Sequence, residues 1–122
     1  MLVDRVSKLK VETRKCGSKA VVISAQGVLD AHTSPQLEKK ISNIFNKGIF
    51  WVVIDLGGVK YISSAGAGVL ISSMQEAEDN GGKFLFVKPS TSVKELFELL
   101  GLTNIFQSFD NQSDAIAYIT GR

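Results

Sequence analysis

Two adjacent hydroxyl groups, on Ser63 and Ser64, stand between a strongly apolar segment and a segment with helical spacing. A serine at the start of a helix can accept hydrogen bonds from backbone N–H groups that the helix leaves unpaired. A phosphate on such a serine would meet the same donors and the positive end of the helix dipole. These residue types at this spacing therefore indicate a switch site at the beginning of a helix.

The small residues Gly66-Ala67-Gly68 follow the two serines, and glycines after a strand can let a phosphate approach the backbone. The dinucleotide pattern G-x-G-x-x-G would need a third glycine where Ile71 stands, and the chain has no phosphate-loop motif ending in lysine. Small residues here would also let the first helical turn lie close to a sheet or to a partner surface. We therefore favour packing and docking over tight nucleotide binding.

A hydrolase site could be assembled only from Ser64, His32 and Asp30, the serine, histidine and aspartate available near loops. A nucleophile elbow needs glycine two residues before and two residues after its serine. Ser64 has Ile62 and Gly66 at those positions, so the pattern is incomplete. We expect no catalytic residue and no enzymatic activity.

Length and net charge limit the classes of protein to which this chain can belong. A chain of 122 residues, 44% of them apolar, suits one compact domain, which we place over residues 1–122. Residues 1–8 show no clear period, and we expect a loose leader or a short edge element there. The net charge is +2, and the lysines are spread along the chain with no cluster that is interleaved with aromatic residues. This pattern argues against nucleic-acid binding.

Cysteine content and apolar runs bear on location and cofactors. The single Cys16 cannot form an internal disulfide, and with the single His32 it cannot build a metal site of the usual Cys/His kind. The apolar runs are shorter than the ~18 residues that a membrane span needs, and no signal peptide is apparent. We therefore expect a cytoplasmic protein with no cofactor, no metal and no membrane partner.

The first part of the chain predicts a hairpin followed by a helix. Alternating apolar residues from Leu9 predict a strand, and residues 20–25 predict a second strand that pairs with it in antiparallel fashion. Residues 27–33 are expected to form a connection. Ser34-Pro35 then predicts an N-cap followed by proline at the first helical position, and Gly48 closes this helix.

The second part alternates strands and helices. Trp51-Val52-Val53-Ile54 is a continuous apolar run typical of a strand covered on both faces, and it predicts a strand over residues 50–56. Gly57-Gly58 predicts a break after it. Residues 64–79 then resume helical spacing. The later elements are a strand over 83–87, a helix opened by the capping-box pair Ser92 and Glu95 and ended at Gly101, a strand over 105–109, and a helix opened by residues 111–113.

This order of elements predicts an α/β fold. Strands separated by helices of this length are usually parallel neighbours joined by right-handed crossovers. An initial hairpin followed by such alternation gives a mixed sheet of about five strands with about four packed helices.

Several segments of the chain also match a known family pattern. They are Gly27-Val28-Leu29-Asp30, Val53-Ile54-Asp55-Leu56 with Val59 and Tyr61-Ile62, the run from Ser63 to Leu70, and residues 93–106. On these residues the chain resembles a STAS domain of the anti-sigma factor antagonist type. The resemblance spans about residues 9–119, and the serine-containing loop is its most specific part.

The resemblance implies a small bacterial switch protein without catalytic activity. Such a protein, when unphosphorylated, binds an anti-sigma factor that is also a serine kinase, and this frees the sigma factor. The kinase inactivates it by phosphorylating a serine at a helix start, and a PP2C-type phosphatase reverses the modification. We expect these two protein partners, no nucleic acid, and a monomer or weak dimer.

Carried over by position, the resemblance makes Ser64 the phosphoacceptor, because it stands two residues before Gly66. Ser63 occupies the position where many relatives have aspartate, and it is the second choice. Asp30 matches the acidic residue of the loop that lies beside the acceptor in the family. The partner-binding residues expected on this basis are Asp30, Ser63, Ser64, Ala65, Gly66, Ala67 and Gly68.

Two other functions remain open at this point. The same fold could serve as a scaffold or regulatory STAS module that binds other proteins without phosphorylation, in which case both serines would simply cap the helix and its turn. It could also sense a nucleotide or a small anion at the helix start. Stable partner binding by a Ser64→Asp variant would favour the first function, and a thermal shift with nucleotide or phosphate would favour the second.

Overall fold

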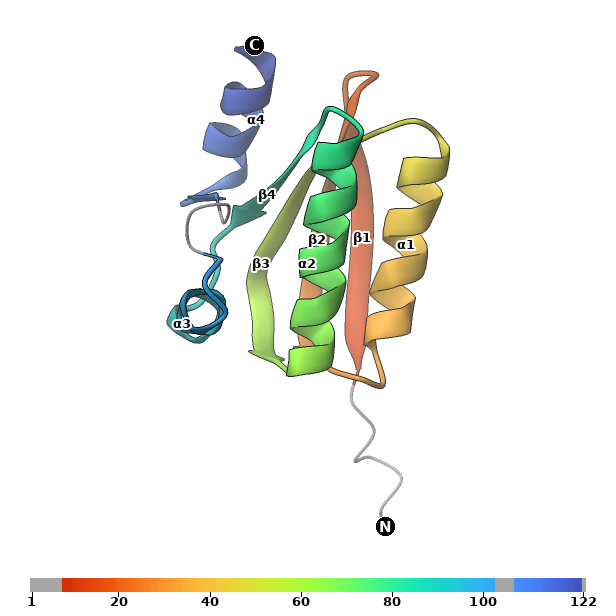
Figure 1. The fold of residues 1–122 in the computed structure, drawn as a ribbon. Helices are drawn as coiled ribbons and strands as arrows, with labels where there is room; N and C mark the ends of the chain where they lie inside the picture. The colour runs from red at the N-terminus through yellow and green to blue at the C-terminus, as the bar shows by residue number, and fades with distance from the viewer. Residues whose placement is uncertain (1–7, 103–106, 122) are drawn as a thin grey trace.

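The computed structural model describes residues 8–102 and 107–121, which contain a five-stranded sheet in the order β1-β2-β3-β4-β5 (Figure 1). The first pair is antiparallel and the other three pairs are parallel, so the predicted mixed α/β sheet is confirmed. Of the predicted leader over residues 1–8, only Lys8 is among the described residues. Residues 105 and 106 of the predicted last strand also lie outside them.

The predicted hairpin consists of β1 (Leu9–Cys16) and β2 (Ala20–Leu29). β2 is longer than predicted, because residues 27–29 pair with β3 instead of forming a connection. Gly27 allows this extension: its φ is +116, and a Cβ there would lie 2.3 Å from the Lys8 carbonyl oxygen. Only glycine fits such a conformation and such a close approach without strain.

β3 (Trp51–Ile62) runs straight through Gly57-Gly58, so the break predicted there was wrong. Its register against β2 shifts twice, because β3 has one extra residue around Gly57-Gly58 and another at Lys60. Glycine inside a strand often marks such a β-bulge rather than a chain break. The strand therefore carries the chain directly to the helix that follows.

The other strands and helices follow the predicted order. They are α1 (Ser34–Asn46), α2 (Ser64–Asp79), β4 (Lys83–Val87), α3 (Thr91–Leu99), β5 (Ser108–Phe109) and α4 (Gln112–Thr120). The predicted helix over residues 64–79 and the predicted strand over 83–87 match these bounds. Gly48, with φ +81, follows the end of α1 as expected.

Two predicted N-caps were wrong. The N-cap of α1 is Thr33, and Ser34 is already the first helical residue, with its hydroxyl donating to the Asp30 carbonyl oxygen. The N-cap of α3 is Ser90, whose side chain accepts a hydrogen bond from the Val93 amide at 3.2 Å. In both places several residues could cap the helix, and the path of the incoming chain selects among them.

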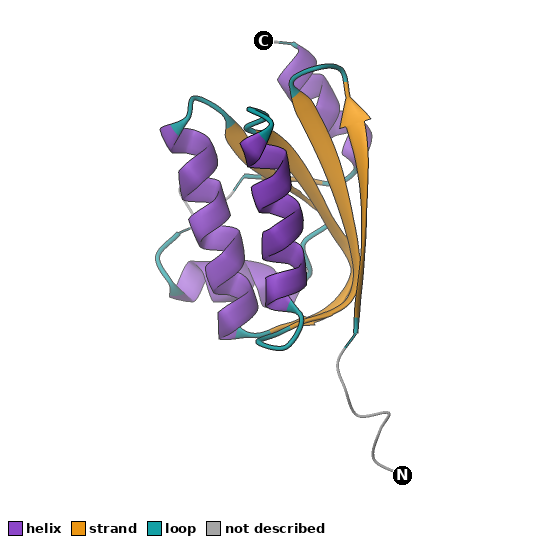
Figure 2. Cartoon of the chain, turned by 90° about the vertical axis from the view of Figure 1, so that its right-hand side faces the viewer, coloured by secondary structure: helices purple, strands orange, loops and turns teal. Residues whose placement is uncertain are grey.

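The helices lie on both faces of the sheet in unequal numbers (Figure 2). α1, α2 and α3 cover one face, and the main core lies beneath them, built from residues such as Ile23, Ile54 and Leu70. α4 covers part of the other face through a smaller cluster that includes Val22, Val53, Leu85, Val87 and Ala115. This arrangement places the ends of β2 and β3 beside the start of α2.

Candidate functional site

The start of α2 is capped by Ser63, which lies directly after β3. Ser63 has an extended backbone, and its Oγ accepts a hydrogen bond from the Gly66 amide at 3.2 Å. Its carbonyl oxygen accepts from the Ala67 amide at 2.9 Å, which begins the helix. Of the two candidate caps, the structure therefore selects Ser63, and its half-buried hydroxyl already has a structural role.

Ser64 is the first residue of α2, and it is exposed. No described residue forms a hydrogen bond with its hydroxyl group. The amides of Ser64 and Ala65 lie in the first helical turn, where the helix itself supplies no acceptor. Ser64 thus combines an accessible hydroxyl with backbone donors at the positive end of a 16-residue helix.

The three small residues after the serines lie in different environments. Gly66 and Ala67 are buried, whereas Gly68 is exposed. A Cβ on Gly66 would lie 2.6 Å from the Leu29 carbonyl oxygen, while a Cβ on Gly68 would meet nothing within 4 Å. Gly66 therefore allows the first turn of α2 to pack on the end of β2, as the preference for packing had predicted.

Asp30 organises the loop between β2 and α1. Its Oδ1 accepts hydrogen bonds from the backbone amides of His32 at 2.9 Å and Thr33 at 3.1 Å. The neighbouring Leu29 carbonyl oxygen accepts from the Ser63 amide at 2.9 Å. Because β2 and β3 are parallel, their carboxyl ends meet at one edge, and the Asp30 loop lies next to the start of α2.

Of the predicted partner-binding residues, the structure brings four to the surface at the α2 start and buries two. Ser64, Ala65 and Gly68 are exposed and Ser63 is half-buried, whereas Gly66 and Ala67 support the helix from below. Asp30 is half-buried and lies at the adjacent loop. These residues share one end of the molecule, although they come from two separate segments of the chain.

Sequence reasoning missed one large surface residue near this end. Tyr61 lies two residues before the N-cap, and it is 58% exposed. Its exposure could not be found by counting alternate residues, because the bulge at Lys60 shifts the alternation of β3. The sequence feature that could have indicated the exposure of Tyr61 is the glycine pair Gly57-Gly58, which precedes this bulge.

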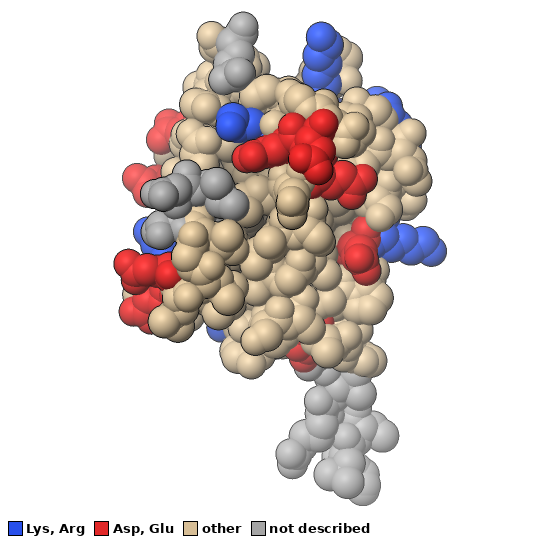
Figure 3. Space-filling model, viewed as in Figure 1, with Lys and Arg blue, Asp and Glu red and all other residues tan. Residues whose placement is uncertain are grey.

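The first part of α2 carries no charged side chain. Residues 64–74 contain no acidic or basic side chain, whereas the end of the helix carries exposed Glu76, Glu78 and Asp79. In Figure 3 the acidic atoms gather near this end of α2, and the surface over the opposite half is mostly uncharged. A charge added at Ser64 would therefore be the dominant charge on this part of the helix.

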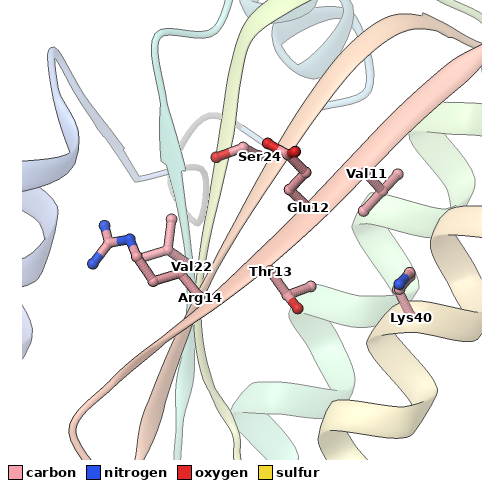
Figure 4. A pocket seen from close by; sticks show the side chains of 7 residues that line it. All are labelled: Val11, Glu12, Thr13, Arg14, Val22, Ser24 and Lys40. Carbon is pink, nitrogen blue, oxygen red and sulfur yellow. The ribbon is translucent and has the colours of Figure 1, made fainter.

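A separate hollow of about 450 Å³ lies across the edge strand β1. Figure 4 shows that Lys40 comes to it from α1, while Arg14 extends away from α1 on the other side of the strand. None of the predicted site residues lines this hollow. It therefore forms no part of the site at the start of α2.

The described residues offer neither a metal-binding cluster nor a membrane-spanning helix. No cluster of three or more histidine, cysteine or acidic side chains that could hold a metal ion occurs within residues 8–102 and 107–121. Among the described helices, none combines the length and the apolar character that crossing a membrane requires.

Comparisons with known proteins give a consistent picture. A family model described as the STAS domain matches residues 10–115. An anti-sigma F factor antagonist from Lysinibacillus sphaericus is 31% identical over 96 residues, which cover 78% of this chain and 79% of that protein. The structure of the anti-sigma factor antagonist SpoIIAA in its unphosphorylated form has a TM-score of 0.80 at 25% identity, covering 93% of this chain and 98% of that chain. The structure of the Bacillus cell fate determinant SpoIIAA in the phosphorylated form has a TM-score of 0.76 at 23% identity, covering 90% and 99%.

Proposed function

The chain belongs to the STAS domain family, and on this premise we propose that it is an anti-sigma factor antagonist controlled by phosphorylation of Ser64. In the unphosphorylated form it binds an anti-sigma factor that is also a serine kinase, at the surface around the start of α2. Phosphorylation by that kinase ends the binding, and a PP2C-type phosphatase restores it. The similarity to SpoIIAA and to the Lysinibacillus antagonist supports the anti-sigma partner.

The observation that carries this proposal is the unequal environment of the two serines. The Ser63 hydroxyl caps α2 and is half-buried, whereas the Ser64 hydroxyl is exposed and has no described partner. A kinase can reach Ser64 without disturbing the cap. Phosphorylation of Ser63 would instead break the hydrogen bond from the Gly66 amide to the Ser63 hydroxyl. Such a capping bond contributes about 1 kcal/mol to helix stability.

The charge of a phosphate is large enough to act as a switch at this place. A phosphoserine carries about −1.5 to −2 charges at neutral pH, and residues 64–74 have no charged side chain of their own. Like charges brought together across an interface cost several kcal/mol. A reversal from 99% bound to 1% bound needs about 5.5 kcal/mol. Repulsion together with the added bulk therefore suffices if the partner covers Ser64.

The fold itself should tolerate the phosphate. An anion at the positive end of a helix is stabilised by about 0.3–2 kcal/mol, depending on burial and geometry. The first-turn amides of Ser64 and Ala65 can donate to the phosphate oxygens. The modification therefore acts on the partner interaction and leaves the protein folded.

The test combines capture and phosphosite mapping. The chain carrying Ser64→Ala serves as bait, and the captured anti-sigma factor is purified. It is then incubated with ATP and, in separate reactions, with the wild-type chain, the Ser63→Ala variant and the Ser64→Ala variant. We expect mass spectrometry to find phosphate on Ser64 of the wild type and of the Ser63→Ala variant, and no phosphate on Ser63 of the Ser64→Ala variant. Phosphate on Ser63 alone would move the switch to that residue, and phosphate on neither serine would reject the switch.

A further inference from the structure

The sheet face opposite α1 and α2 is only partly covered. α4 packs on the apolar part of this face, over residues such as Val22, Val53 and Leu85. Toward the other end of the strands the same face is open (Figure 2). The residues there are polar and exposed, including Lys10, Gln26 and Lys60. This open part lies beside the end of β3 that leads into α2.

Two adjoining hollows lie on this open part. The larger, of about 570 Å³, is lined by Lys8, Leu9, Lys10, Gln26, Gly27, Gly58 and Lys60. The smaller, of about 220 Å³, shares Gln26 and Gly58 with it and extends to Asp55 and Lys88. Gly58 lines both hollows, and Gly57 lines the smaller one. A Cβ on Gly58 would lie 2.7 Å from the Gln26 Cγ, and a Cβ on Gly57 would lie 2.9 Å from the Lys88 Cδ.

The lysines leave the larger hollow with an excess of positive charge. Lys8, Lys10 and Lys60 come from separate places in the sequence and meet around one depression. Only Lys10 has a described acidic partner, Glu12, at 3.7 Å, and both side chains of that pair are about two-thirds exposed (67% and 65%). An exposed pair of this kind is weak and easily exchanged for another partner.

The acidic group of the smaller hollow is already engaged within the protein. The Asp55 Oδ2 accepts a hydrogen bond from the Gln112 side chain at 2.8 Å, and its Oδ1 accepts from the Gly57 amide at 2.8 Å. Asp55 is therefore held on the side of α4. The lysines around Gly58 are left to face an external group.

We propose that this lysine hollow, defined by Lys8, Lys10 and Lys60 around Gly58, binds an acidic segment of the same anti-sigma factor that covers Ser64. This inference rests on the proposed function and adds a second contact region to it. Exposed lysines contribute little one at a time, so a shallow hollow of this kind suits a protein segment with several carboxylates better than a small anion. Charges arranged in this way mainly speed association and select the partner.

The lysine hollow lies at the same end of the molecule as the proposed docking surface. Lys60 is followed by the exposed Tyr61, and Ser63 begins the helix cap two residues later. The Lys8 carbonyl oxygen accepts a hydrogen bond at 3.0 Å from the amide of Val28, which lies on β2 beside β3. In Figure 1 the start of β1 and the start of α2 both lie at the lower end of the molecule. A partner that covers Ser64 and Tyr61 can therefore reach the lysines.

Charge reversal tests this proposal. We compare Lys10→Glu/Lys60→Glu with Lys15→Glu/Lys19→Glu, which changes the net charge equally at the hairpin turn on the opposite end of β1. Association with the purified anti-sigma factor from the capture experiment is measured by surface plasmon resonance at about 50 mM and 500 mM salt. We expect the association rate of the hollow variant to fall about tenfold or more at low salt, and the difference to shrink at high salt. The control should stay within about twofold of wild type.

The possible outcomes separate this inference from the proposed function. If the wild type binds and the two charge-reversed variants associate equally fast, the lysine hollow is not a contact region, although the proposed function stands. If the wild type does not bind the anti-sigma factor, both proposals fail. If the wild type binds a 20-base-pair DNA duplex or vesicles containing phosphatidylserine, and only Lys10→Glu/Lys60→Glu abolishes that binding, the hollow serves another class of partner and the inference is overturned.

Discussion

The backbone carbonyl oxygen of Leu29 accepts a hydrogen bond from the amide of Ser63 at 2.9 Å, which joins the last residue of β2 to the N-cap of α2. The same oxygen would lie only 2.6 Å from a Cβ on Gly66. One carbonyl group thus sets both the position of the cap and the closeness of the first helical turn. This contact decides which serine caps the helix and which one faces solvent.

Removing each serine hydroxyl should have unequal effects on stability. We expect Ser63→Ala to lower the free energy of unfolding by about 1 kcal/mol, because the Gly66 amide loses its acceptor. Ser64→Ala should change it by less than about 0.5 kcal/mol, because the residue is exposed and its hydroxyl has no described partner. Urea denaturation followed by circular dichroism measures both. Equal losses in the two variants would contradict the assignment of the cap.

Alanine at the two helical glycines should act in opposite directions. Gly66→Ala places a methyl group against the Leu29 carbonyl oxygen, and we expect a loss of about 1–3 kcal/mol in the free energy of unfolding. Gly68→Ala has open space, and it should stabilise the helix by about 0.5–1 kcal/mol. The two variants are matched in chemistry and helix, so thermal unfolding compares them directly. A stabilised Gly66→Ala variant would show that the close approach is not needed.

A permanent negative charge at Ser64 should weaken partner binding without unfolding the protein. We expect Ser64→Asp to keep the wild-type unfolding temperature within a few degrees and to raise the Kd for the anti-sigma factor by about 100-fold, since unfavourable charge at an interface costs several kcal/mol. Ser72→Asp is the control, because Ser72 is exposed on the same helix away from its start. Isothermal titration calorimetry would show similar Kd values for Ser64→Asp and wild type if the partner does not cover Ser64.

The side chain of Gln112 should contribute to the attachment of α4. Its amide oxygen accepts from the Arg14 Nη2 at 2.8 Å, and its amide nitrogen donates to the Asp55 Oδ2 at 2.8 Å. We expect Gln112→Ala to lower the free energy of unfolding by about 1–2 kcal/mol, because hydrogen bonds to charged groups are lost. Gln75→Ala, an exposed glutamine on α2, should be nearly neutral. A double-mutant cycle with Arg14→Ala that gave no coupling energy would refute the bridge.

Much of the fold could be predicted because its signals are local. The apolar run 51–54, the glycines after the helices and the serines at the start of α2 are each signals carried by a few neighbouring residues, and they predicted the order of elements and the mixed sheet. The STAS resemblance drawn from the same segments is confirmed by the family match. The break predicted at Gly57-Gly58 was wrong, since a glycine pair in a bulge and a glycine pair in a turn look alike in sequence.

The candidate site, like the fold, could be predicted only in part. Both serines were found from their place before a helix, yet either one could have been the cap on local grounds alone. The choice depends on Leu29, which lies 34 positions earlier in the chain than Ser63 and meets it only because β2 and β3 are parallel neighbours. The lysine hollow could not be predicted at all, because its lysines come from the residue before β1, from the start of β1 and from the far end of β3.

By itself the sequence determined the order of the strands and helices, that a hydroxyl stands at the start of α2, and which family the chain resembles, because propensity, capping and spacing are properties of neighbouring residues. Only the tertiary structure decided that Ser63 is the cap and Ser64 the exposed group, that Gly66 serves packing while Gly68 does not, and that three separated lysines share one hollow. These facts depend on strand register and close approach between distant segments, which arise only when the sheet has assembled.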